Sequence, residues 1–252
     1  IGDAGAADTG KRVQDAIGQI LTRQSSNGGF GLWYADSGDL WLEAYVTDFL
    51  SRARAMGYQV PDSAMKQAIN NLRNRANYAT EPQHASAEEN AALAYALMVL
   101  ARERAATVGD LRYYADTVPE AFSTPMAAAN LGAALASYGD QARADRLFRR
   151  AGETVDLNGT EPYRYRPDYG TRLRDATALL ALAADAKSQA VDTAALTSAV
   201  AERIAWTEET GQSLSTQESI WTVLAARALS QSAPPAALNG VTLSQPVATQ
   251  PE

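Results

Sequence analysis

The 252-residue sequence contains no cysteine, which excludes disulfides, cysteine-ligated zinc and thiol catalysis within these residues. It also lacks a run of lysine or arginine, and its formal net charge of -7 is spread in mixed sign. Because nothing in this pattern could follow a phosphate backbone, we expect no nucleic-acid partner. No apolar run approaches the ~20 residues that span a bilayer, so we expect no direct membrane insertion. We likewise expect no metal and no cofactor.

Helical periodicity is the strongest feature that the sequence does have. Between Asp39 and Gly57, apolar residues recur every three to four positions and so share one face of a helix. Strand-like alternation is almost absent before Leu238–Val247. The same spacing predicts about ten helices, near 10–24, 39–57, 62–76, 87–105, 109–116, 125–138, 140–154, 171–187, 192–205 and 216–231.

Capping signals support several of these boundaries. Ser86 and Ser215 are each followed three residues later by glutamate, which is the spacing of a capping box. Gly57 and Gly139 suit the left-handed conformation that closes a helix.

The predicted helices alternate in character along the chain. Segments 91–101, 126–136 and 176–184 are apolar on nearly every side, whereas 62–76, 140–151 and 192–205 have a charged face. A helix that is apolar all round must be enclosed, and a half-polar helix can lie outside it. The pattern, which has no fixed-length repeat, predicts an all-α fold: an α/α toroid of about ten helices in five pairs.

One distinctive string joins the first two predicted helices. It consists of Gln24, Gly28, Gly29, Phe30 and Trp33. The glycines permit tight backbone conformations, and we expect Phe30 and Trp33 to act as large apolar anchors while the Gln24 amide holds a helix end to the turn. We interpret the string as architectural; a contribution to a recognition surface is the alternative. It resembles the glutamine-tryptophan repeat of α/α toroids in terpenoid cyclases, prenyltransferases and complement-type thioester domains.

The sequence separates some of these toroids by their chemistry. The acidic clusters DxDD and DDxxD of terpenoid cyclases do not occur, and the zinc site of protein prenyltransferases needs a cysteine that is missing. An α/α-barrel carbohydrate-active enzyme would need two carboxylates that face one cleft, and it remains an alternative.

Four motifs in order resemble the thioester domain of bacterial α2-macroglobulins. The stretch Gly28–Trp33 is followed by Asp39–Leu50, which contains Trp41 and is close to the family's WLTAYVxDFL helix. Asp168–Asp175 and Leu214–Glu218 look like two later signatures of the family. The resemblance covers about 20 to 230.

This resemblance implies a module of a broad-spectrum protease inhibitor and not an enzyme. Such domains present an internal thioester between a Cys and a Gln three residues later, which captures proteases covalently. Because the motif is missing, we expect the thioester Cys and Gln upstream of Ile1, together with a missing first helix pair; a family branch without a thioester is the competing explanation. We expect the toroid over 1–232 and, over 233–252, a linker that leads to an adjoining β-sandwich domain. The implied partners are proteases and neighbouring β-sandwich domains, in a bacterial periplasm or cell envelope, with a role in host defence.

His84 is the only histidine and lies between two predicted helices. Its place is roughly that of the complement-type histidine that steers a thioester toward hydroxyl acceptors, although the spacing to the next helix differs. A solvated loop histidine is the simpler interpretation. Tyr163, Tyr165 and Tyr169 lie in a loop that we expect to pack over the mouth of the barrel, with a protein-contact surface as the alternative.

Overall fold

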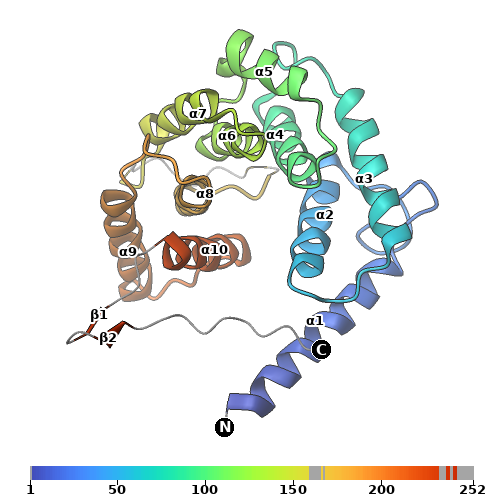
Figure 1. The fold of residues 1–252 in the computed structure, drawn as a ribbon, viewed down its shortest axis with the longest axis horizontal. Coiled ribbons are helices and arrows are strands. Elements are labelled where there is room, and N and C mark those ends of the chain that lie inside the picture. Colours follow the sequence, from blue (N-terminus) through green and yellow to red (C-terminus); the bar gives the residue numbers. More distant parts are fainter. Residues whose placement is uncertain (1, 159–165, 167, 233–236, 239–240, 243–252) are drawn as a thin grey trace.

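The computed structural model describes residues 2–158, 166, 168–232, 237–238 and 241–242 (Figure 1). Within these residues the chain forms ten α-helices, one 3-10 turn and a two-stranded antiparallel β-pair. The all-α prediction is therefore confirmed. The elements are α1 (Gly2–Leu21), α2 (Leu40–Ala55), α3 (Asp62–Asn77), α4 (Ala87–Arg102), α5 (Val108–Thr117), η1 (Pro119–Ala121), α6 (Pro125–Ser137), α7 (Gln141–Thr154), α8 (Arg172–Asp185), α9 (Thr193–Glu209), α10 (Thr216–Ser232), β1 (Ala237–Leu238) and β2 (Val241–Thr242).

Most helix boundaries lie within a few residues of their predicted places, and α1 is the main exception. It begins at Gly2 and not near residue 10. Residues 2–9 contain no proline and several alanines, and alanine is the strongest helix former, so the helix extends through them. The capping boxes of Ser86 with Glu89 and of Ser215 with Glu218 are both formed. Of the stretch Leu238–Val247, for which we expected an extended structure, Leu238 lies in β1 and Val241–Thr242 form β2, while 239–240 and 243–247 lie outside the described residues.

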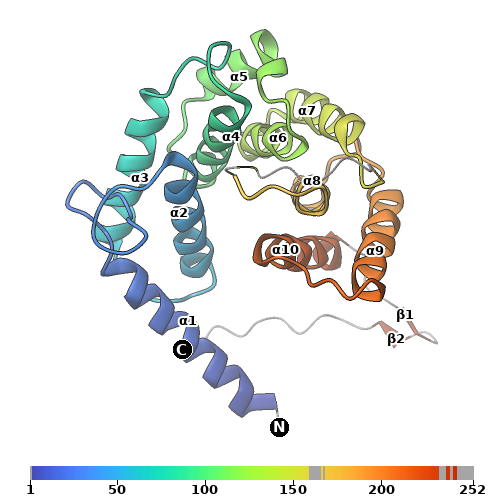
Figure 2. The ribbon, with the colours of Figure 1, turned by 180° about the vertical axis from the view of Figure 1, so that it is seen from behind.

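The helices form two concentric layers (Figures 1 and 2). Helices α2, α4, α6, α8 and α10 make the inner ring, and α3, α5, α7 and α9 lie outside it. Burial follows the layers: every residue of α4 from Asn90 to Ala101 is buried, whereas α7 buries a single stripe that includes Leu147 and Phe148. The all-round apolar character of three segments had predicted enclosed helices. Their burial in the inner layer confirms the predicted toroid.

Side chains join the last inner helix back to the first. The Tyr45 hydroxyl of α2 lies close enough to the Gln217 side chain of α10 for that side chain to influence the pKa of the hydroxyl, and the Arg227 guanidinium contacts the Met56 sulfur at 3.7 Å. The first and last inner helices therefore approach each other through side chains.

An outer helix returns the chain between successive inner helices (Figure 1), and residues near the starts of α2, α4, α6 and α8 line one small cavity together. The first turns of these inner helices consequently lie at one end of the ring, which we call the N-terminal mouth. A pocket at this mouth brings together the starts of α2 and α4 with Asp168, which shortly precedes α8. Among the described residues, none of the helices combines the length and the apolar character that crossing a bilayer needs.

Candidate functional site

The glycine-rich corner after α1 fastens three helices together. The Gln24 amide nitrogen donates a hydrogen bond to the carbonyl oxygen of Ala64 in the first turn of α3, at 2.9 Å. Phe30 is buried in a cluster formed by α1, α2 and α3. Gly28 has φ +91°, and a Cβ there would lie 2.3 Å from the Gln67 carbonyl oxygen, so α3 packs directly on the glycine backbone. Gly29 lies against Glu43 and leaves no room for a Cβ either.

Trp33 does not anchor this corner, and our prediction for it is wrong. Its side chain is 83% exposed, and the neighbouring Leu32 and Tyr34 are exposed as well. Phe30 already occupies the space between the three helices. Backbone bridges from Gln24 to both Phe30 and Asp36 then make the intervening residues loop outward.

The tryptophan that anchors the N-terminal mouth is Trp41, in the first turn of α2. It is 8% exposed and stacks on Tyr45 with ring centroids 5.1 Å apart. Its ring also meets Tyr169 at 4.9 Å and Tyr95 at 6.4 Å. Because Tyr169 comes from the segment before α8, Trp41 joins the second family motif to the third.

An ion cluster fixes the start of α8. Arg174 is fully buried; its guanidinium donates to the Asp168 carboxylate at 2.9 Å and to the Asp175 carboxylate at 2.6 Å. Arg166 contacts both carboxylates from the other side, at 2.7 and 2.8 Å. A Cβ at Gly170 would lie 2.2 Å from Cζ of Arg166, so a larger residue there would displace this guanidinium. Each buried charge is therefore paired, as burial requires.

The cluster also sets the ionisation of Asp168. Burial opposes the charged form, but the charges and hydrogen bonds of Arg174 and Arg166 outweigh it and hold the pKa of Asp168 below its ordinary 3.8. Asp168 is therefore a carboxylate at neutral pH and not a general acid.

The fourth motif meets the third at the same mouth. Thr171, which caps α8, donates a hydrogen bond from its hydroxyl to the Glu218 carboxylate of the capping box on α10, at 2.7 Å. With the contact between Tyr45 and Gln217, this brings the second, third and fourth motifs into one assembly. The sequence showed only their order; their meeting depends on the fold, which brings the starts of α2, α8 and α10 together.

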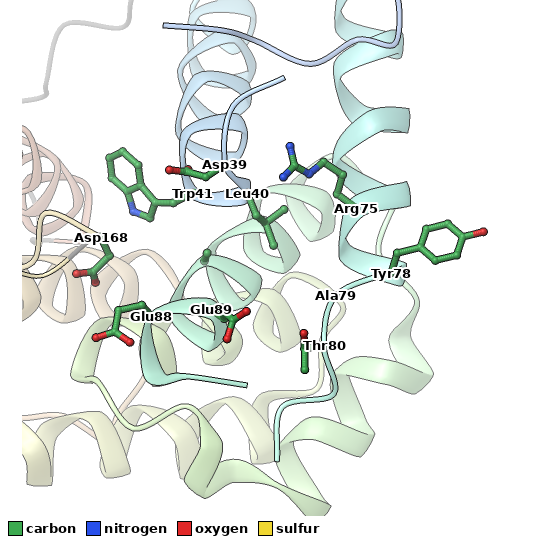
Figure 3. Close-up of a pocket in the computed structure, with 11 residues that line it drawn as sticks. Asp39, Leu40, Trp41, Arg75, Tyr78, Ala79, Thr80, Glu88, Glu89 and Asp168 are labelled. Carbon is green, nitrogen blue, oxygen red and sulfur yellow. The ribbon is translucent and has the colours of Figure 1, made fainter. Parts of the chain in front are cut away.

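A pocket of about 480 Å³ opens at the N-terminal mouth, beside Trp41 (Figure 3). Four carboxylates line it, but three have structural partners. Asp39 accepts from the Leu42 backbone amide, Glu89 closes its capping box, and Asp168 belongs to the ion cluster. Glu88 is the one carboxylate lining this pocket for which no structural partner is described.

His84 is exposed in the turn before α4, where its backbone amide donates to the Glu81 carbonyl oxygen. Its role as a modulator stays a prediction. Of the three loop tyrosines, Tyr169 packs on Trp41 as expected, while Tyr163 and Tyr165 lie outside the described residues.

No protein-family model matches the chain. It is 33% identical over 193 residues to the α2-macroglobulin of Escherichia coli K12, an alignment that covers 72% of this chain and 11% of that protein. The crystal structure of native E. coli α2-macroglobulin, from domain MG7 to the C-terminus, superposes with a TM-score of 0.73 and 30% identity, covering 88% of this chain and 35% of the other.

The chain belongs to the bacterial α2-macroglobulin family.

E. coli α2-macroglobulin activated by porcine elastase is similar as well, with a TM-score of 0.71 and 30% identity over 86% of this chain and 19% of the other. The chain thus spans about a tenth of the length of the curated α2-macroglobulin that it matches, with 11% of that protein covered.

Proposed function

We propose that the chain is a module of a bacterial α2-macroglobulin that inhibits proteases of broad specificity by trapping them. The observation that carries the proposal is the assembly at the N-terminal mouth, where three of the family motifs meet through Trp41, Thr171 and Gln217. The structural relative activated by elastase is itself a protein that responds to a protease. The role proposed for this module is to build a rigid platform, and it performs no catalysis.

The covalent chemistry lies outside these residues in this proposal, because a thioester needs a cysteine and the sequence has none. In the capture step, the nitrogen of a protease lysine attacks the acyl carbon of the thioester and forms an amide. The carbon-sulfur bond breaks, and the departing thiolate takes up the proton that the amine loses.

The module has neighbouring segments and a cellular location in this proposal. We propose that 1–232 is the toroid without its first helix pair, and that 233–252 leads to a neighbouring β-sandwich domain of the same polypeptide. The parent protein then acts in the periplasm or cell envelope, and its partners are proteases. His84 lies in the turn before α4, in sequence between Thr80 and Glu88, which line the mouth pocket, and we keep for it a modulating role on the thioester.

Incubation of the full-length parent protein with trypsin tests this function. We expect trypsin to become linked by an amide that survives boiling in denaturant and reductant, and to lose activity on large protein substrates. Trypsin with dimethylated lysines is the control and should form no such adduct. Inhibition without any covalent adduct would support a thioester-free scaffold instead. Undiminished cleavage of large substrates would contradict the proposal.

A further inference from the structure

A small cavity lies beneath Trp41, between the inner helices. Its volume is about 10 Å³, which is close to the smallest space that holds one water molecule. Asn130 of α6 lines it, is 1% exposed, and its side-chain oxygen has no hydrogen-bond partner among the described residues. A buried acceptor without a partner costs stability, so this oxygen requires an explanation.

The other polar walls of the cavity show which ligand fits. Arg174 and Trp41, whose side chains carry N–H donors, and Asp168, whose side chain carries a carboxylate, are also among the residues that line it. The positive charge of Arg174 disfavours a cation and the negative charge of Asp168 disfavours an anion, while the volume excludes a larger molecule. A neutral group that both donates and accepts satisfies all of these conditions.

We propose that this cavity binds one ordered water molecule, which donates a hydrogen bond to Asn130 Oδ1 and links α6 to the pair of Asp168 and Arg174. A buried water makes two to four hydrogen bonds to groups that are otherwise unsatisfied, and these walls offer enough partners. The water then connects the middle of the inner ring to the ion cluster, directly below the ring of Trp41. This inference does not depend on the proposed function.

The substitution Asn130→Leu tests the proposal by the sign of its effect. If a water molecule satisfies the Asn130 oxygen, leucine removes the acceptor of that water and leaves the water's other partners without their hydrogen bonds. We then expect the melting temperature to fall by about 2–4 °C. If the oxygen is unsatisfied, leucine relieves that cost, and an unchanged or higher melting temperature would overturn the proposal. Thr222→Val is the matched control: the Thr222 hydroxyl also has no partner among the described residues but does not line this cavity, so its loss should not lower the melting temperature.

A crystal structure of the parent protein provides a second and direct measurement. At a resolution that shows ordered water, we expect one density peak within hydrogen-bond distance of Asn130 Oδ1, and no such peak in the Asn130→Leu variant. Wild-type density in which the cavity is empty, or in which another side chain fills it, would overturn the proposal even if Asn130→Leu does not fold.

Discussion

Replacing Trp41 with alanine is expected to lower the free energy of unfolding by about 3–5 kcal/mol, the usual cost of deleting a large aromatic side chain from a core. Trp41 is 8% exposed and contacts the rings of Tyr45, Tyr95 and Tyr169, so its loss opens a cavity at the N-terminal mouth. It also frees Tyr169, and with it the segment before α8. Urea unfolding followed by far-ultraviolet circular dichroism measures the change.

Trp33 provides the matched control for this experiment. It is the same residue type, eight positions earlier, but 83% exposed, so Trp33→Ala should change the free energy of unfolding by no more than about 0.5 kcal/mol. Equal losses from the two substitutions would show that Trp33 is an anchor after all, and that the mouth is packed differently from the structure described above.

Replacing Arg174 with methionine is expected to cost about 3–5 kcal/mol, because it keeps the volume but leaves two buried carboxylates with one partner fewer. Arg174 is fully buried, and Asp168 and Asp175 are 4% and 3% exposed. Arg166 alone then has to balance both charges, although its own side chain is partly exposed. Urea unfolding at neutral pH measures the loss.

The same variant should unfold more readily in acid. The pKa of Asp168 is lowered in the folded state, so its contribution to stability is present above its ordinary value of 3.8 and is lost as the pH falls through the lower folded value. Without Arg174 the folded pKa rises, and the loss of stability should begin at a higher pH. Arg54→Met is the control: its partner Asp62 is 87% exposed, and such a pair contributes at most about 1 kcal/mol. An acid transition that does not move would contradict the assigned role of the cluster.

The two tryptophans show where sequence reasoning succeeds and where it stops. Sequence reasoning separated the enclosed helices α4, α6 and α8, which are apolar on nearly every side, from helices such as α7, which bury one stripe, and that difference is local to each segment. The local sequence does not determine whether Trp33 or Trp41 is buried. Phe30 is buried among α1, α2 and α3, and its burial depends on how these three helices meet. Size and hydrophobicity alone therefore favoured Phe30 correctly and Trp33 wrongly.

The ion cluster was harder still to predict. The spacing from Asp168 to Asp175 looked like a family signature, but nothing in it showed that Arg174 would be fully buried or that Arg166 would complete the cluster. Burying a guanidinium requires partners that arrive from the preceding loop and from the helix start together. Such an arrangement depends on the tertiary structure around Trp41 and cannot be predicted from the spacing of the residues.

Methylamine treatment of the full-length parent protein, followed by mass spectrometry of the intact chain and of its peptides, tests the central claim most directly. We expect the protein to gain the mass of one methylamine and one thiol to become reactive. We expect the modified glutamine to lie in a peptide outside these 252 residues. A mass that stays unchanged in a protein that still links covalently to trypsin would contradict this claim.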